Sequence, residues 1–563
     1  MKLLSVLCKA VLWICLPFLS YGAKNEPLDF PKDTCSSVAS IADFGAKPRF
    51  MSTPNPTVSS IKIIRKAVFD EASTELGDRW LKALYSMHVL TRSAVIEGQL
   101  LFQQGKAVSL AELAETERLL RQRDYLMDAR VGVSNPCESA IDVEVIAQDG
   151  WSLIPHLEWG FSGGNDKSGL GLREKNVLGT GVSVEVRSIR NLDRRGRQVE
   201  VSTPHLLNTR TQSKLRFEDN NDGKIAGFEI GQPFYSLNAS RAWGLSMGSE
   251  EARVGLYKLG ERFQENATER DYMEVSYGFS KGLIDGRSHR LVFGVEYEEL
   301  KVWENAVDPI RNSPDINQKT LAPFFEWSSV VDRFLVVQNF DLIGLTEDLA
   351  TGFAHRFRFG LSSKGLGADA DVMLLSADLS NTWLASEKGL MQWRLNGRSR
   401  LNLDRGAQED ITLNSHVRWL YKPSPNYGYQ AMIRFDLLRN QRRGGALFFG
   451  GETGARGFAD RLQTGDRRVI FRLDRRVYLE KSFFGLANAG WLVFADVGKA
   501  WGMQGINGSI SSILANVGLG IRVAPTKAER GKVVHIDLAF PVNHRDDPAV
   551  SRYELVFAIK DGF

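Results

Sequence analysis

Between residues 150 and 563 the chain consists of short segments in which apolar and polar residues alternate, and helical periodicity nearly vanishes. Alternation with a period of two predicts β-strands that have one apolar and one polar face. Strands therefore dominate this region. The pattern is clearest in three segments, at Val182, Val184 and Val186, at Val534, Ile536, Leu538 and Phe540, and at Leu555, Phe557 and Ile559.

Turn residues separate these segments, and Asp222-Gly223 and Asp285-Gly286 are typical of tight β-hairpins. One apolar and one polar face, repeated over so long a region, indicate a transmembrane β-barrel with lipid outside and water inside. Several tryptophans near the predicted strand ends fit the aromatic girdles of such barrels. A soluble β-sandwich, propeller or β-helix would show the same alternation, although no fixed repeat of about 40–50 residues supports a propeller.

The N-terminus has the features of a secretory signal peptide over residues 1–22. Lys2 is basic, the segment 3–19 is almost entirely apolar, and Gly22 and Ala23 are small residues suited to cleavage. The apolar run is short for a helix that crosses about 30 Å of hydrocarbon. No later stretch is long and apolar enough to form a transmembrane helix, so we expect the exported chain to be soluble or to span a membrane as a barrel.

Residues 58–149 have a different pattern, and residues 23–57 before them read as a linker or arm. A strand near 60–69 is followed by helical spacing from Trp80 to Phe102. Ser109 and Glu112 then form the capping-box pattern at the start of a second helix. Two further strands, 125–133 and 141–146, complete the order strand, helix, helix, strand, strand. This order predicts a compact α+β domain.

The charge balance bears on which classes of partner the protein binds, and the cysteine content bears on its redox compartment. The 71 basic and 67 acidic residues leave a net charge of +4, which is too even to suggest a nucleic-acid partner. Cys8 and Cys15 lie in the signal segment. Cys35 and Cys137 remain in an oxidising compartment, where they form either a disulfide or two free thiols.

Signatures of catalysis and of metal binding are missing from the sequence. There is no GxSxG or HExxH motif and no Cys–His metal spacing, and the eight histidines are scattered. We therefore expect no enzymatic activity, no catalytic residue, no metal and no cofactor.

Two motifs resemble the superfamily of outer-membrane assembly and secretion barrels, which includes the BamA and TamA insertases and the two-partner secretion transporters. Residues 450–458 (GGETGARGF) resemble its loop motif, and residues 494–498 (FADVG) resemble its F-x-D-x-G strand motif. Phe557, Ile559 and Phe563 resemble the C-terminal strand signal of such barrels. As in that superfamily, five strand-like segments follow the loop, at 467–483, 489–501, 513–525, 532–543 and 553–563.

Residues 58–149 resemble a single POTRA domain, the periplasmic module of the same superfamily, and residues 149–153 resemble its exit into the first barrel strand. The resemblance implies an all-β transmembrane barrel of about 16 antiparallel strands over residues 150–563. It also implies that the loop near 441–466 folds inward. The chain would lie in a bacterial outer membrane with its small α+β domain in the periplasm.

The two motifs predict an electrostatic lock between loop and wall. Arg456 on the inward loop would meet Asp474 and Asp496, which we place on the polar face of two wall strands. Gly457 would let the loop backbone approach the wall, and Phe458 would wedge into the lumen beside the strand that carries Gly498. The alternative is a loop that only plugs and stabilises the barrel.

The resemblance implies a translocator or insertase that moves polypeptides into or across the outer membrane. Its partners would be unfolded outer-membrane or secreted polypeptides, outer-membrane lipids and periplasmic accessory proteins. Two other functions remain open, namely a passive channel plugged by its loop and a lipid-handling member of the same superfamily.

Overall fold

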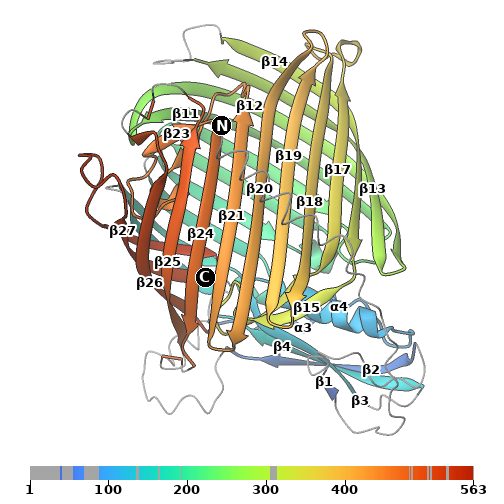
Figure 1. Cartoon of the computed structure of the whole chain (residues 1–563). Coiled ribbons are helices and arrows are strands. Elements are labelled where there is room, and N and C mark those ends of the chain that lie inside the picture. The colour runs from blue at the N-terminus through green and yellow to red at the C-terminus, as the bar shows by residue number, and fades with distance from the viewer. Residues whose placement is uncertain are drawn as a thin grey trace.

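The fold was established from a computed structural model of the chain (Figure 1). It describes residues 39–40, 55–68, 88–134, 139–162, 165–191, 193–304, 314–480, 482–483, 486–503, 506–507, 510–527 and 532–561. The predicted signal peptide, Cys35, Cys137 and Phe563 lie outside these ranges.

None of the described helices combines the length and the apolar character that crossing a membrane requires.

The N-terminal α+β domain is a four-stranded sheet with two helices. The sheet order is β1-β3-β4-β2, with β2 parallel and β3 antiparallel to β4. Helix α4 starts with the predicted capping box, in which Ser109 Oγ accepts from the Glu112 backbone N–H and Glu112 accepts from the Ser109 N–H. The elements are β1 (Ala39–Ser40), β2 (Thr57–Lys66), α3 (Ser93–Glu97), α4 (Leu110–Arg121), β3 (Leu126–Ser134) and β4 (Ala140–Asp149).

Two predictions about this domain need correction. Within the described part of the segment 80–102, only Ser93–Glu97 is helical. Arg92 is extended, and the backbone before the helix forms other hydrogen bonds. The Thr91 N–H donates to Asp149 Oδ2 at 2.7 Å, and the Arg92 N–H donates to Gly179 O at 2.9 Å. The segment read as an arm contributes strand β1, which pairs with β3.

Most of the remaining described chain forms a closed antiparallel barrel of twenty strands, in which each wall strand lies beside the next wall strand along the chain and β28 meets β5. Their bounds are β5 (Leu153–Ser162), β6 (Asn165–Glu174), β7 (Ser183–Arg190), β8 (Arg195–Thr203), β9 (Gln212–Asn220), β10 (Gly223–Gln232), β11 (Arg241–Lys258), β12 (Glu261–Ile284), β13 (Arg287–Trp303), β14 (Ile316–Val331), β17 (Gly352–Ser362), β18 (Val372–Ser386), β19 (Gly389–Asn402), β20 (Ala407–Ser424), β21 (Tyr427–Arg439), β24 (Arg467–Tyr478), β25 (Ala487–Trp501), β26 (Leu514–Pro525), β27 (Lys532–Pro541) and β28 (Glu554–Asp561).

The expected number of about 16 strands is therefore too low. The five strands predicted after the loop are all present, as β24 to β28. The excess lies before the loop, where fifteen strands form the described part of the wall. Alternation of apolar and polar residues predicts that a segment is a strand. The number of strands that closes a barrel depends instead on the tilt and stagger of all its strands.

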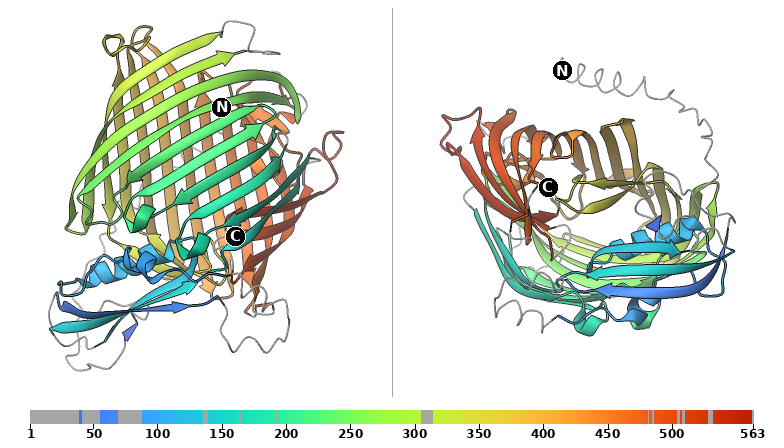
Figure 2. Two further views of the ribbon diagram at one scale, coloured as in Figure 1. Left: turned by 180° about the vertical axis from the view of Figure 1, so that it is seen from behind. Right: turned by 90° about the horizontal axis from the view of Figure 1, so that it is seen from below.

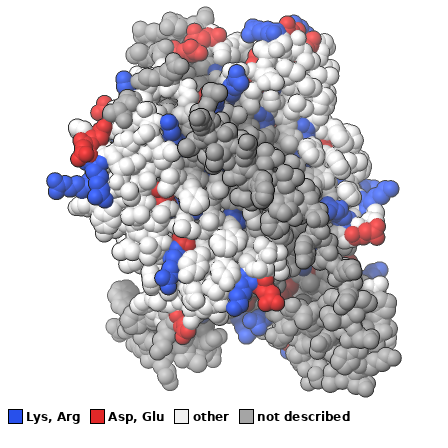
Figure 3. Space-filling view, in the orientation of Figure 1, with Lys and Arg blue, Asp and Glu red and all other residues white. Residues whose placement is uncertain are grey.

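The side chains are sorted as a membrane barrel requires. Tyr277, Phe293 and Phe325 are register partners on three adjacent strands, and all three are exposed on the outer face. On the inner face, Arg358 pairs with Glu274 at 2.8 Å and with Glu326 at 3.1 Å. In the face shown by Figure 3, most of the described surface is uncharged, and the charged side chains lie scattered, mainly around its margins. An apolar exterior and a polar lumen are the pattern of a barrel in lipid.

The α+β domain lies against one end of the barrel, which we call the near end (Figures 1 and 2). The turns of the wall hold it there. Asn176 Nδ2 donates to Thr91 Oγ1 at 2.8 Å, and the Arg210 guanidinium donates to Leu100 O at 2.6 Å. The Leu237 N–H donates to Glu115 Oε1 at 2.7 Å. Three separate connections between wall strands therefore form hydrogen bonds with the domain.

Two small hairpins are additional to the wall. The first, β15 (Phe334–Gln338) and β16 (Thr346–Ala350), interrupts the near-end connection between β14 and β17. The second, β22 (Leu447–Phe449) and β23 (Gln463–Gly465), belongs to the far-end loop between β21 and β24. That loop is the predicted inward loop.

Candidate functional site

The candidate site is formed by the loop between β21 and β24 and by the inner face of β24 to β27. The β22–β23 hairpin holds the two ends of the loop together, and a short turn, Gly451–Thr453, follows β22. Gly450 has φ +131°, and a Cβ there would lie 2.1 Å from Ala459 O, so the turn requires glycine. This turn directs the following residues onto the wall.

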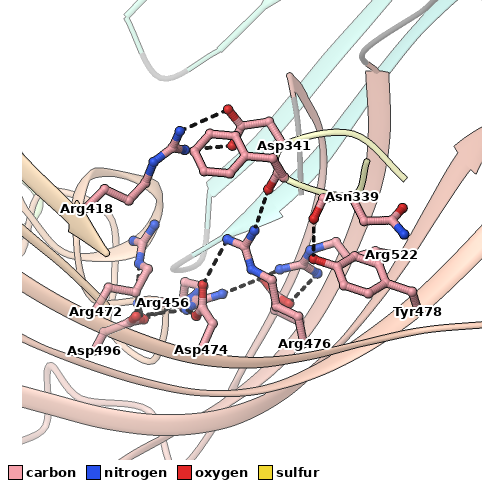
Figure 4. Close-up of polar contacts among 12 residues, drawn as sticks. Asn339, Asp341, Arg418, Arg456, Arg472, Asp474, Arg476, Tyr478, Asp496 and Arg522 are labelled. Carbon is pink, nitrogen blue, oxygen red and sulfur yellow. Dashed lines mark hydrogen bonds and ion pairs between the residues drawn. The ribbon is translucent and has the colours of Figure 1, made fainter. Parts of the chain in front are cut away.

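Arg456 is buried among three carboxylates of the wall (Figure 4). Its Nε and Nη2 donate to the two oxygens of Asp496 at 2.9 and 2.8 Å, which is a bidentate pair. Nη2 also donates to Asp474 at 3.4 Å, and Nη1 donates to Asp537 at 3.4 Å. The predicted contacts of Arg456 with Asp474 and Asp496 are confirmed by this geometry.

The guanidinium also lies over an aromatic ring of the wall. The central carbon of Arg456 is 3.4 Å from the centroid of Phe494. Phe494 is the first residue of the FADVG motif, and Asp496 is the third, so both face the lumen from β25. A desolvated cation over an aromatic face contributes up to about 2 kcal/mol. The motif therefore provides both the carboxylate and the ring that hold the loop.

Charge balance keeps Arg456 ionised despite its burial. Burial alone lowers the pKa of a guanidinium, but Asp496, Asp537 and Asp474 outweigh it and raise the pKa of Arg456 above its ordinary value. Removing one partner of a buried ion pair is strongly destabilising, because it leaves the other charge buried without compensation.

Each carboxylate of the site also has an arginine of the wall as a partner. Arg472 Nε donates to Asp496 at 3.1 Å, and Arg476 donates to Asp474 at 3.3 Å. The Arg522 guanidinium contacts both oxygens of Asp537, at 2.7 and 3.1 Å. Removal of Arg456 would therefore leave none of the three carboxylates without a positive partner. This arrangement suits a loop that can be released while the wall stays paired.

Glycines bring the loop and the wall into contact. A Cβ on Gly457 would lie 2.7 Å from Asn516 Cβ on β26, and a Cβ on Gly498 would lie 2.7 Å from the Phe449 ring of the loop. Phe458 is fully buried with Phe449, Ala455 and Leu462 against the wall, so it packs between loop and wall and does not project into an open lumen. The predicted close approach at Gly457 is confirmed.

The structure brings six predicted residues together: Arg456, Gly457, Phe458, Asp474, Asp496 and Gly498. Sequence reasoning did not identify Asp537, Phe494 or the three wall arginines as parts of the site. Asp537 lies on the polar face of the alternating segment 533–540. A carboxylate on that face is a signal that could have identified it as a partner of Arg456. Phe557 and Ile559 lie on β28, which pairs with the strand that carries Asp537.

Within the described residues, no group of three or more His, Cys, Asp and Glu side chains could hold a metal ion.

Comparisons with known proteins gave matches only among solved structures. No family model and no curated protein matches the sequence. BamA from Haemophilus ducreyi lacking POTRA domains 1–3 is 10% identical, with 90% of this chain and 85% of that chain covered at a TM-score of 0.36. CdiB from Acinetobacter baumannii is 13% identical, with 100% and 97% covered at 0.41. CdiB from Escherichia coli is 10% identical, with 90% and 91% covered at 0.44.

Proposed function

We propose that this chain is an outer-membrane barrel that inserts polypeptides into the membrane or moves them across it. Its N-terminal α+β domain would be a POTRA-like module in the periplasm, so that the near end of the barrel is periplasmic. This work needs no catalytic residue, nucleotide or cofactor.

The observation that carries the proposal is the seam where the barrel closes. Within the described residues, the first and last strands, β5 and β28, share one register pair, Phe557 with Phe161. By contrast, β28 pairs with β27 over eight residue pairs, and β5 pairs with β6 over ten. Within the described residues, the seam is therefore the least extensively paired boundary of the wall. Such an edge can pair with an incoming strand.

The α+β domain offers a second edge for polypeptide capture. Strand β2 is the outer strand of its sheet, and nine of its ten residues pair with β4. Its first residues also bond to the segment 105–108 on the other side, as when the Val58 N–H donates to Lys106 O at 2.9 Å, so the outer edge open to a new strand is that of residues 60–66 within the described structure. Strand addition at such an edge supplies main-chain hydrogen bonds without demanding a particular sequence. This suits a partner that arrives unfolded, such as an outer-membrane or secreted polypeptide, alone or with a periplasmic accessory protein.

A cysteine pair across the seam tests the proposal. Phe161→Cys with Phe557→Cys, in a chain carrying Cys35→Ser and Cys137→Ser, joins β5 to β28 on oxidation. The matched control is Leu215→Cys with Phe228→Cys, which are register partners in the fully paired β9 and β10. Insertion of an unfolded test barrel into liposomes containing the purified variants is measured with and without reductant.

We expect oxidation to abolish assisted insertion in the seam variant, reductant to restore it, and the control to be active in both states. Equal insertion by the oxidised and reduced seam variants would rule out a role for seam opening.

A second candidate function is the passage of ions or of a polypeptide substrate through the lumen. The polar side chains of the inner wall favour it. A cavity of about 550 Å³ opens among the charged side chains of the inner wall, including Arg270, Glu298, Arg358 and Arg400. If the lumen is the path, a seam-locked barrel will still conduct ions or translocate its substrate, and the same variant separates the two functions.

A further inference from the structure

The hairpin β15–β16 is an independent unit attached to the barrel by a narrow neck. Its two strands pair with each other over five residue pairs, from Phe334 with Ala350 to Gln338 with Thr346, and form a two-stranded sheet separate from the wall. At the neck, the Thr351 N–H donates to Arg333 O at 2.7 Å. The next residue, Gly352, has φ +88°. The hairpin can therefore move without breaking the ladder of any barrel strand.

The tip of the hairpin satisfies its own backbone. The Glu347 carboxylate accepts the N–H groups of Phe340, Asp341 and Leu342 at 2.7, 3.0 and 3.2 Å. Asn339 Oδ1 accepts the Gly344 N–H at 2.6 Å. A tip with its own hydrogen bonds keeps its shape when it leaves the wall, because few buried groups are left unpaired.

The tip lies against a distant part of the wall (Figure 4). The hairpin begins next to β17, but the polar contacts of its tip are with β20, β24 and β25, which are three, five and six positions away in the strand order. The Arg418 guanidinium of β20 forms a bidentate pair with Asp341, at 2.6 and 3.1 Å. The hairpin therefore crosses the interior of the barrel as a chord.

Backbone carbonyls of the hairpin accept further hydrogen bonds from the wall, among them Gln338 O from Lys422 Nζ at 2.7 Å, and the apolar side chains of Phe340 and Ile343 pack against wall residues. Arg476 Nη1 donates to Phe340 O at 3.3 Å, and the Tyr478 hydroxyl donates to Asn339 O at 3.0 Å. Asn488 Nδ2 donates to Ile343 O at 3.1 Å. All of these contacts, like the Arg418 pair, use wall side chains, so they can be released one by one.

The base of the hairpin is clamped to the α+β domain, and Figure 1 shows β15 next to α4 at the near end. Arg121 of α4 forms a buried bidentate pair with Asp348, with both distances 2.8 Å. Arg118, one turn earlier, contacts Asp332 at 3.4 Å and lies over the Phe334 ring at 4.0 Å. A movement of α4 would therefore pull on the hairpin.

The tip also connects to the loop lock. Arg476, which holds Phe340 O, donates to Asp474, and Asp474 also accepts from Arg456 of the far-end loop. Polar contacts thus run from α4 through the hairpin to Arg456.

We propose that the β15–β16 hairpin is a gate across the near end of the lumen. The Arg418–Asp341 and Arg121–Asp348 pairs hold it shut, and displacement of the α+β domain from the barrel releases it. The trigger rests on the proposed function, in which an incoming polypeptide moves the domain. The gate itself requires no polypeptide.

Conductance in planar lipid bilayers tests the gate. Asp341→Asn with Asp348→Asn breaks both clamps and keeps Glu347, Asn339 and the loop lock intact. A second variant replaces residues 334–350 by Asn-Gly, which removes the hairpin. The control is Asp404→Asn, which removes a carboxylate from an ion pair with Lys364 (2.7 Å) at the far end. A heat-sensitive shift in gel mobility verifies that each barrel is folded.

We expect conductance to rise several-fold in both hairpin variants and to equal that of the natural chain in Asp404→Asn. Folded hairpin variants that conduct like the natural chain would overturn the gate. For the coupling, Arg121→Gln should increase hydrogen exchange at the amides of Phe340 to Leu342, and unchanged protection there would overturn the link to the domain. Because no polypeptide is present, failure of this test is distinct from failure of the insertion assay.

Discussion

At the scale of single residues, Asp496 is the centre of the loop lock. It is fully buried and accepts from the Arg456 side chain and backbone N–H, from Arg472 and from Asn516. Asp474 and Asp537 contact Arg456 at 3.4 Å only, and each has an arginine of its own. The three carboxylates are therefore unequal in holding the loop.

This inequality predicts an order of effects. Arg456→Ala and Asp496→Asn should each make the loop 440–466 much more sensitive to protease in the folded barrel, and Asp474→Asn should do so least. Removing one partner of a buried ion pair costs about 3–5 kcal/mol, and we expect the low end for Asp496→Asn because Arg456 retains two carboxylates. Limited proteolysis with mass spectrometry measures the order. Equal cleavage of the Asp474 and Asp496 variants would contradict it.

A histidine at the interface between domain and barrel predicts a dependence on pH. His205 lies in the near-end turn after β8, where its Nε2 is 2.8 Å from the Tyr125 hydroxyl. Burial, helped by Arg123, lowers the pKa of His205 below its ordinary value of about 6.5, and burial raises the pKa of Tyr125 to about 12. Both groups are therefore neutral in the assembled interface.

A released domain would expose His205 and let it bind a proton more readily. The contact is thus fully stable above about pH 6.5 and weakens as the pH falls below that value. We expect hydrogen exchange at residues 123–127 to increase between pH 7.5 and pH 5.5, after correction for the intrinsic rate, and His205→Gln to remove most of this increase. The same increase in the variant would show that another group is responsible.

At the scale of elements, local patterns predicted what depends on neighbours in sequence. The capping box at Ser109 and Glu112 placed the start of α4 correctly, and the Asp285-Gly286 turn has positive φ at both residues, 50° and 74°, as a tight hairpin requires. The β15–β16 hairpin did not stand out as a separate unit. Its strands alternate like wall strands. Only the structure shows that they pair with each other and that the tip contacts β20, β24 and β25.

At the scale of the whole molecule, the barrel reverses the usual distribution of apolar side chains. Val275 on β12 is 48% exposed on the outer face, whereas its neighbour Ser276 faces the lumen. An arginine that faces lipid at the middle of the bilayer destabilises the folded barrel by about 2–4 kcal/mol. An arginine that faces a water-filled lumen does not have this effect.

The whole-barrel prediction uses this pair of neighbours. Val275→Arg should lower the fraction that folds into lipid vesicles and shift its urea midpoint downward, and Ser276→Arg should fold like the natural chain. Heat-sensitive gel mobility after refolding measures both. If the two variants folded equally well, β12 would not face lipid on that side.

By itself, the sequence determined the alternating strands, the α+β domain, the five strands after the loop and the lock between Arg456 and the two aspartates. These features depend on side-chain periodicity and on motifs whose spacing is visible along the chain. Only the tertiary structure decided that twenty strands form the described barrel, that Asp537 and Phe494 complete the lock, and that β15–β16 crosses the lumen. The closure of the barrel, the meeting of lock residues from separate strands and the path of the β15–β16 hairpin across the lumen all depend on the curvature of the whole wall. No local sequence pattern encodes that curvature.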